Sequence, residues 1–355
     1  MTDVTIMGGG IFGLSLAFVC LERGARVRVV EKKAVGAGSS GGLIGALAPH
    51  VPENWNVKKA FQLRSLLRIG DFWARVETVS GKPSGYERTG RLQPVKDAKA
   101  LELARARAVS ARTLWKQAAE WRVVRAETAG EWAPLSPTGW LIEDTLSARL
   151  HPRRALEALT TAIRALGGRI MRGENPPDNA GAVVWATGHE GLQMLADDLG
   201  RPMGNGVKGQ AALLRPVHPL PGRLPQIFAD AVHVVAHADG TVAVGSTSER
   251  QFDRPDSCDT QLDMVIARAR AAVPALAEAE VIARWAGVRP RAISRAPLLG
   301  PWPGRPGHFI MNGGFKIGFA LAPELAGILA GLVLEGRNDI PEDFAIDHLL
   351  AKQDG

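Results

Sequence analysis

Cysteine and tyrosine are scarce in this 355-residue chain, which has two cysteines and one tyrosine. Cys20 and Cys258 stand far apart, so they form neither the paired spacing of a metal site nor a disulfide framework. Cys20 also falls within an apolar, helical pattern, which favours a small core side chain. We therefore expect no bound metal and no structural disulfide.

Long hydrophobic runs and dense basic runs are missing as well. The most apolar stretch near the C-terminus, residues 319–334, is interrupted by Pro323 and Glu324, and we expect it to be too short to span a bilayer. Because no basic segment followed by a cleavable apolar one opens the chain, we expect a cytoplasmic location. The net charge is +7, but the basic residues are not interleaved with aromatic ones. This argues against nucleic-acid binding and suits anionic substrates or cofactors.

The composition, 46% hydrophobic and 22% charged, is that of an ordinary globular protein, and the length suggests one large or two medium domains. Apolar spacing predicts helices over residues 58–79, 98–125, 153–166, 263–277 and 323–335. It predicts strands at residues 4–7, 26–30, 140–142, 169–171, 182–185, 210–214, 233–236, 242–245 and 309–311. The strands between residues 210 and 245 are separated by Pro and Gly, which favours an antiparallel sheet distinct from the N-terminal one.

The N-terminal residues have the pattern of a strand, a glycine-rich turn, a helix, a second strand and then an acidic residue. Gly8, Gly10 and Gly13 have the spacing of the dinucleotide fingerprint, in which they permit a tight turn, approach to a pyrophosphate and close helix packing. The helix expected over residues 14–19 directs the free N–H groups of its N-terminus at the phosphates. Glu31 ends the second strand, where its carboxylate can accept hydrogen bonds from a ribose 2′-OH. This motif alone does not distinguish NAD from FAD.

Two downstream segments favour FAD. Residues 37–49 are rich in Gly and Ser and have neither helical nor strand period, whereas an NAD-binding domain would continue with a helix and a strand. Such a loop lets the backbone lie against a flat ring, with a plain flexible linker as the alternative. The apolar residues 182–185 then run into Ala186, Thr187 and Gly188, and a small-residue turn after a parallel strand is where such a sheet accepts its cofactor.

Taken together, five segments resemble the D-amino-acid oxidase superfamily of flavoproteins, and most closely its glycine oxidase-like branch. They are GGGIFG with VVE, GSSGGLIGALAP, VVWATG, WAGVRPRAISRAPLLGP and GGFKIGFALAPELA, in the family's order and across nearly the whole chain. The resemblance implies an α/β fold with a Rossmann-like FAD-binding domain, discontinuous over residues 1–80, 141–205 and 286–355. It also implies a second, antiparallel-sheet (α+β) substrate domain over residues 81–140 and 206–285.

The resemblance further implies FAD, with the 42–44 segment close to the isoalloxazine, and non-covalent binding, since no flavinylation motif can be matched. The residues expected to contact the cofactor are Gly8, Gly10, Ile11, Phe12, Gly13, Glu31, Lys32, Ser39, Ser40, Gly42, Leu43, Ile44, Ala186, Thr187, Gly188, Gly314, Phe315, Lys316, Ile317 and Gly318. The segment between residues 171 and 183 is shorter than the family's usual small sheet, which leaves the cover of the adenine open.

Three residues are candidates for work on the substrate. In the family, the arginine of the WAGVRP-like segment, here Arg289, pairs with the substrate carboxylate; a structural arginine is the alternative. Several relatives place a tyrosine over the substrate, but the matching position here is His233, which can contact substrate, gate entry or be structural. Lys316 stands where glycine oxidases tend to have an arginine, and it can supply positive potential beside the flavin.

The expected activity is FAD-dependent oxidation of the C–N bond of a small amino acid: glycine, an N-substituted glycine or a D-amino acid. In the family, hydride passes to flavin N5 and the imine is then hydrolysed. O₂ or a quinone is the expected acceptor, and homo-oligomerisation is left open. The alternatives are an FAD-dependent tRNA wobble-uridine modifying oxidase, an NAD-dependent dehydrogenase, and a flavin-binding protein without turnover.

Overall fold

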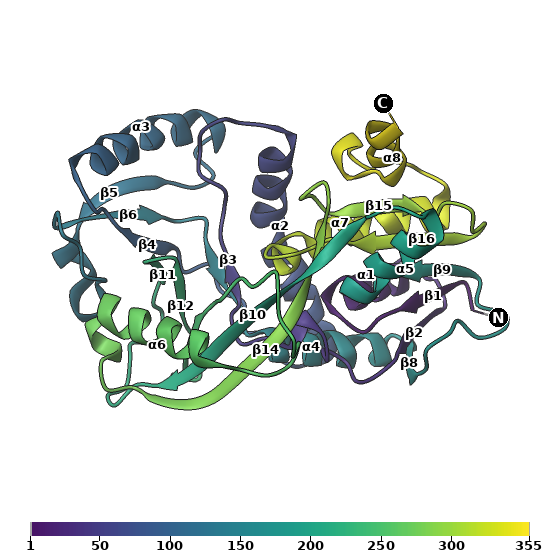
Figure 1. The fold of residues 1–355 in the computed structure, drawn as a ribbon, viewed down its shortest axis with the longest axis horizontal. Helices are drawn as coiled ribbons and strands as arrows, with labels where there is room; N and C mark the ends of the chain where they lie inside the picture. Colours follow the sequence, from purple (N-terminus) through teal and green to yellow (C-terminus); the bar gives the residue numbers. More distant parts are fainter. Residues whose placement is uncertain (1, 355) are drawn as a thin grey trace.

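A computed structural model describes residues 2–354 and contains two large sheets (Figure 1). The six-stranded sheet, in the right half of Figure 1, has the order β15-β16-β9-β1-β2-β8. All neighbouring strands are parallel except the pair β15 and β16. The strands are β1 (Val4–Met7), β2 (Val27–Glu31), β8 (Arg169–Arg172), β9 (Ala182–Trp185), β15 (Leu298–Pro301) and β16 (His308–Asn312).

Helices cover both faces of this sheet. Alternate strand residues enter different core clusters: Ile6 packs with the cluster of α1, α2, α4 and α7, whereas Met7 packs with that of α5 and α8. This alternation is typical of a parallel sheet buried on both sides. The helices are α1 (Ile11–Glu22), α2 (Val57–Ser80), α4 (Pro152–Ala165), α5 (Gly188–Leu199), α7 (Gly318–Glu335) and α8 (Ile346–Asp354).

The second large sheet has eight strands in the order β14-β10-β13-β12-β11-β4-β6-β5. Its neighbours are antiparallel except β11 and β4, and α6 packs on one face around a separate core. The elements are β4 (Arg91–Pro94), α3 (Ala98–Leu114), β5 (Trp121–Arg125), β6 (Trp140–Asp144), β10 (Gly204–Arg215), β11 (Gln226–Ala229), β12 (Val232–Ala236), β13 (Val242–Gly245), α6 (Thr260–Ala272) and β14 (Glu280–Ala292). The predicted fold class is therefore confirmed.

Short elements complete the chain. β3 (Ala46–Leu47) and β7 (Ala148–Arg149) pair with each other, and four 3₁₀ turns cover Ser39–Gly41, Ala126–Trp132, Pro274–Leu276 and Glu342–Phe344. Thus the segment expected to be irregular over residues 37–49 contains a 3₁₀ turn and a two-residue strand. The predicted strands on either side of the first helix are confirmed.

Two helix predictions were too long. The helix expected over residues 98–125 ends at Leu114, because Lys116 and Gln117 have positive φ values of 49° and 61° and the chain then forms β5. The helix expected over residues 263–277 ends at Ala272, and Pro274 starts a separate turn. In both places the chain breaks at a backbone conformation that apolar spacing does not encode.

Strand membership also differs from the expected domain segments. Residues 141–144 of β6 lie in the eight-stranded sheet, although we assigned them to the FAD-binding segment, and β14 runs across the expected boundary at residue 286. Long-range pairing decides this: β6 pairs with β4 and β5, and β14 pairs with β10. The division into two discontinuous domains stays a prediction.

Helix α7 starts earlier than expected. It begins at Gly318, so Pro323 lies inside the helix rather than at its first turn. At 18 residues and a mean hydropathy of 1.5, α7 is long and apolar enough to cross a membrane, and our length argument against this was wrong. However, seven of its residues belong to the core cluster that also contains residues of α1 and α2: Ala320, Leu321, Ala322, Leu325, Ala326, Leu329 and Ala330. A buried core helix satisfies the same length and hydropathy criteria.

Candidate functional site

A cavity of about 860 Å³ lies at the carboxyl ends of β1, β2 and β9 and extends to β12 and β14. The N-terminal glycine turn, the loop after β2, the turn after β9 and most of residues 314–320 line it. Phe228, His233, Ser246 and Arg289 line it as well. Ligands bind at this edge of a doubly wound parallel sheet, where the strand order changes.

The glycine turn is shaped by close backbone contacts. Gly8 has a φ of 110°, and a Cβ there would lie 2.5 Å from the Ala186 carbonyl oxygen. A Cβ on Gly13 would lie 2.0 Å from the Gly8 carbonyl oxygen, so α1 can close on β1 only without a side chain. Gly10 is the N-cap of α1 and makes no side-chain capping hydrogen bond, and it faces the cavity. The turn therefore presents the start of α1 to a ligand, as a dinucleotide pyrophosphate requires.

Glu31 and Ser40 hold the turn in place. Glu31 Oε2 accepts a hydrogen bond from Gly9 N at 2.6 Å, and Oε1 accepts one from Lys33 N at 2.9 Å. Each carboxylate oxygen has a second lone pair, so Glu31 can still accept from a ribose hydroxyl. Ile11 N donates to Ser40 Oγ at 3.0 Å, which brings the 39–42 loop over the start of α1.

The turn of residues 314–318 closes the cavity beside α1. A Cβ on Gly314 would lie 2.8 Å from Phe12 Cζ, so the two segments are in contact. Phe315 has a positive φ of 41°, and its N–H donates to the Pro290 carbonyl oxygen at 3.0 Å. This bond ties the turn to β14, the strand that carries Arg289.

Most of the residues expected to contact the cofactor line this cavity. Three do not, and each has a structural role instead. Gly13 packs α1 on the turn, Leu43 is buried with Ala211 while its carbonyl oxygen receives His237 Nε2 at 3.0 Å, and Ile317 is the N-cap of α7. The residues that do line it are Gly8, Gly10, Ile11, Phe12, Glu31, Lys32, Ser39, Ser40, Gly42, Ile44, Ala186, Thr187, Gly188, Gly314, Phe315, Lys316 and Gly318.

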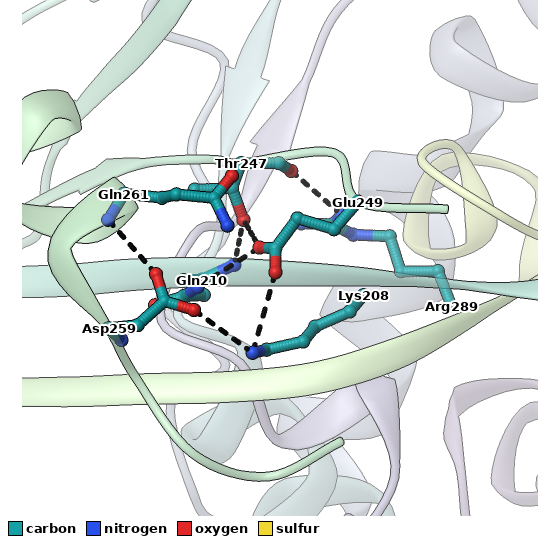
Figure 2. A network of polar contacts seen from close by, with 7 residues as sticks. All are labelled: Lys208, Gln210, Thr247, Glu249, Asp259, Gln261 and Arg289. Carbon is teal, nitrogen blue, oxygen red and sulfur yellow. Dashed lines mark hydrogen bonds and ion pairs between the residues drawn. The ribbon is translucent and has the colours of Figure 1, made fainter. Parts of the chain in front are cut away.

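Arg289 faces the cavity as a cation without an acidic partner. Its Nη2 donates to Ser246 Oγ at 2.7 Å and its Nη1 to the Thr247 carbonyl oxygen at 3.3 Å, and within residues 2–354 it forms no ion pair (Figure 2). Burial lowers the pKa of Arg289 to about 10, against an opposing effect of Glu249, so the side chain is charged at neutral pH. Two of its five N–H groups are used, which leaves donors for a carboxylate.

Ser246 and Thr247 were missed by sequence reasoning, and so was Gly209. A Cβ on Gly209 would lie 2.0 to 2.2 Å from the Arg289 guanidinium atoms Nη1, Nη2 and Cζ. The guanidinium therefore occupies the space above this glycine. No local motif marks these positions; the one available signal was the small-residue run Gly245-Ser246-Thr247 after a predicted strand.

His233 and Lys316 also line the cavity. Burial, and then the positive charges of Arg91, Lys316 and Arg289, lower the pKa of His233 to about 3, so the imidazole is neutral. Its Nδ1 is buried and has no hydrogen-bond partner in the described chain, and its ring centroid lies 4.6 Å from that of Phe228. Burial and the nearby Arg289 and Arg291 lower the pKa of Lys316, which has no ion pair within residues 2–354.

These features fit an anionic dinucleotide that carries a flat ring. The start of α1 and Glu31 suit the diphosphate and ribose. At the other end, Lys316 and Arg289 leave two positive charges facing the cavity. No group of three or more His, Cys, Asp or Glu residues that could hold a metal occurs between residues 2 and 354.

Comparison with known proteins also indicates an enzyme that uses FAD. Residues 3–332 match the family model described as FAD dependent oxidoreductase (DAO). The chain is 27% identical to a glycine oxidase from Geobacillus kaustophilus, over 97% of this chain and 95% of that protein. It is 26% identical to the bifunctional protein ThiO/ThiG from Synechocystis, over 95% of this chain but 52% of that protein, so it spans about half of its length.

Among solved structures, an iminodiacetate oxidase from Chelativorans superposes with a TM-score of 0.84 at 21% identity, covering 97% of this chain and 98% of that one. This likeness shows the fold. The family match covers most of the sequence, from the glycine turn into α7. The chain therefore belongs to the FAD-dependent oxidoreductases of the DAO family.

Proposed function

We propose that this enzyme oxidises the C–N bond of a small amino acid: glycine, an N-substituted glycine or a D-amino acid. The substrate loses two electrons and two protons, one from the α-carbon and one from the nitrogen, to become an imine, which water hydrolyses to a carbonyl product and an amine. The observation that carries this proposal is Arg289, a charged guanidinium with free donors facing the cavity. The 27% identity to a glycine oxidase over nearly the full chain supports it.

The chain's own residues divide the cavity into a cofactor end and a substrate end. In the proposed complex, the start of α1 holds the diphosphate, Glu31 receives the ribose, and the 42–44 and 314–318 segments flank the ring without a covalent bond. FAD, when bound, supplies the two-electron acceptor. Because Lys316 lines the ring end, its charge would stabilise negative charge that builds up there during the reaction.

Arg289 would fix the substrate by its carboxylate. A guanidinium can donate two parallel hydrogen bonds to a carboxylate, which restrains both the position and the direction of the adjacent α-carbon. Such restraint can account for much of the rate acceleration when two reacting atoms must meet at a fixed distance and angle. The contacts to Ser246 and Thr247 keep the guanidinium from swinging into the cavity.

His233 would contact the substrate amine as a neutral imidazole. With a pKa of about 3 it is a weak base, so it does not remove a proton from an ammonium group at neutral pH. The amine would instead lose its proton to water before the reaction, and the imidazole of His233, which lines the cavity, would contact the neutral amine by a hydrogen bond. The rate at low substrate concentration would then rise with pH as the amine deprotonates.

The test is anaerobic mixing of the FAD-loaded protein with glycine, sarcosine and D-alanine, followed by the loss of the oxidised flavin spectrum. Arg289→Ala removes a charged partner of the substrate, which should cost about 2 to 5 kcal/mol. The expected result is a KM at least about thirtyfold higher with unchanged FAD content. Arg284→Ala is the control, because Arg284 lies on the same strand but pairs with Asp263 on the surface.

An Arg289→Ala enzyme with an unchanged KM would remove the carboxylate role, and a flavin that no amine reduces would remove the proposed reaction. The acceptor proposed is O₂ or a quinone. Oxygen consumption, measured with and without an added quinone during turnover, separates these two.

A further inference from the structure

A buried polar network lies behind Arg289 (Figure 2). After β13 the chain continues as residues 246–249 along the edge of β10 opposite to β14. Lys208 N donates to the Glu249 carbonyl oxygen and Glu249 N donates to that of Lys208, both at 2.9 Å. Lys208 Nζ also lies 3.4 Å from Glu249 Oε2, and the two residues are only 3% and 8% exposed. The side chains thus reinforce a backbone pair.

The remaining members of the network, Gln210, Thr247 and Asp259, surround the Lys208–Glu249 pair. Gln210 N donates to Thr247 Oγ1 at 2.8 Å, and Thr247 Oγ1 donates to Glu249 Oε1. Gln210 Nε2 donates to the same carboxylate oxygen at 3.0 Å, while Gln210 Oε1 accepts from Asp259 N at 2.9 Å. Asp259 Oδ2 lies 3.5 Å from Lys208 Nζ. Every carboxylate in this group therefore has a cationic or hydrogen-bonding partner.

This network fixes the acceptors that hold Arg289. Thr247 turns its side chain into the network and its carbonyl oxygen toward Arg289 Nη1, as Figure 2 shows. Ser246, the preceding residue, supplies the second acceptor, at Nη2. A buried ion pair seldom stabilises a fold more than the apolar residues that could replace it. The position of the Lys208–Glu249 pair behind Arg289 therefore points to a geometric role.

We propose that the Lys208–Glu249 ion pair is a positioning device for Arg289 that sets the affinity of the site for a carboxylate. It holds residues 246–249 on β10, and these residues hold the inner side of the guanidinium, which leaves its outer N–H groups aimed into the cavity. This inference rests on the proposed role of Arg289. Lys208 and Glu249 are positioning residues, because neither lines the cavity.

The experiment compares two probes of the FAD-loaded enzyme. Acetate reports the carboxylate subsite through the flavin spectrum, and sulfite reports the reactivity of the flavin itself. The double variant Lys208→Met/Glu249→Gln removes both charges but keeps similar side-chain sizes. We expect acetate binding to weaken about tenfold and the substrate KM to rise by a similar factor. FAD content, sulfite affinity and kcat should stay within about twofold.

A matched control and a conservative variant separate positioning from general destabilisation. Arg107→Met/Glu53→Gln removes an ion pair of 2.5 Å that lies outside the cavity, and it should leave acetate binding unchanged. Lys208→Arg keeps the charge and should retain acetate affinity within about threefold. Should the double variant fail to fold, Thr247→Val, which removes only hydroxyl contacts, should still weaken acetate binding by about threefold.

Unchanged acetate affinity in the folded double variant, or in Thr247→Val, would overturn this inference. Arg289→Met distinguishes that outcome from failure of the proposed function. Where Arg289→Met weakens acetate binding and the double variant does not, only the positioning role is wrong. Where Arg289→Met also leaves acetate binding unchanged, the carboxylate role of Arg289 is itself wrong.

Discussion

Gly209→Ala tests whether the placement of Arg289 controls substrate binding. The added Cβ would lie 2.0 Å from Arg289 Nη1, and real Cβ atoms essentially never approach closer than 3.0 Å, so the guanidinium must move by about 1 Å or more. The backbone of Gly209 is not in the left-handed region, and alanine therefore introduces no backbone strain there. The substitution acts on the position of one side chain and leaves its charge in place.

A displacement of about 1 Å at a substrate-positioning group can cost roughly a hundredfold in rate. We therefore expect kcat/KM for the small amino acid to fall about a hundredfold, or about 2.7 kcal/mol of transition-state stabilisation. FAD content should be unchanged, because Gly209 does not line the cavity. Steady-state kinetics at a saturating concentration of the electron acceptor, with flavin content from the absorption spectrum, measure both quantities.

Two controls decide the interpretation. Gly327→Ala in α7 makes the same chemical change at a position where, apart from the adjacent helix backbone, no atom of residues 2–354 would lie within 4 Å of the added Cβ, and it should leave kcat/KM unaltered. In the Arg289→Ala background, Gly209→Ala should cost nothing further, since its effect is transmitted through that arginine. A Gly209→Ala enzyme within about threefold of wild type would refute the reasoning, and so would full additivity with Arg289→Ala.

Three further predictions concern the cofactor and pH. Lys316→Met should weaken sulfite binding and lower the flavin reduction potential, and unchanged values would remove this lysine from the account. Gly13→Val should abolish FAD binding, because even a Cβ would lie 2.0 Å from the Gly8 carbonyl oxygen; a yellow variant would contradict this. Burial in the folded chain lowers the pKa of His233 to about 3 and that of His237 to about 4. Between these values and about pH 6.5, the unfolded chain therefore binds more protons than the folded chain. Stability should therefore fall with decreasing pH below about 6.5, by at most about 1.4 kcal/mol per unit per histidine. In urea unfolding at pH 6.5 and pH 5, the free energy of unfolding of His237→Gln should change less with pH than that of the wild type. An equal change would count against a buried neutral histidine at this position.

The cofactor end of the cavity was predictable because its signals are local. The φ of Gly8 and the close contact at Gly13 are the backbone features that the glycine spacing predicted. Each feature depends on residues within one strand, turn and helix, so the spacing of the residues along the chain is enough to predict it. The turn after β9 was found for the same reason, since it directly follows an apolar strand.

The proposed substrate end was only partly predictable, because it is built from residues that are distant in the sequence. Arg289 was identified from its family segment, but Ser246, Thr247 and Gly209 reach it only through the register of β14 on β10 and of residues 246–249 on β10. A strand pattern specifies which face a side chain occupies, whereas it does not specify its partner on another strand.

The errors in secondary structure have a similar origin. Residues 121–125 form a strand because β6 pairs with them, although their alanine- and arginine-rich context suits a helix. Pro323 suggested a helix start, but proline can also lie inside a helix when tertiary packing compensates for the lost hydrogen bond, and eight residues of α7 are buried.

The central claim is that one FAD and one carboxylate-bearing amine meet in this cavity beside Arg289. Stopped-flow mixing of the purified enzyme with a small amino acid, without oxygen, tests it most directly. The account predicts a yellow protein whose flavin is bleached by the amino acid, and bleached by the corresponding amine without a carboxylate at least about thirtyfold less efficiently. A colourless protein that does not take up FAD would contradict the account, as would equal bleaching by both compounds.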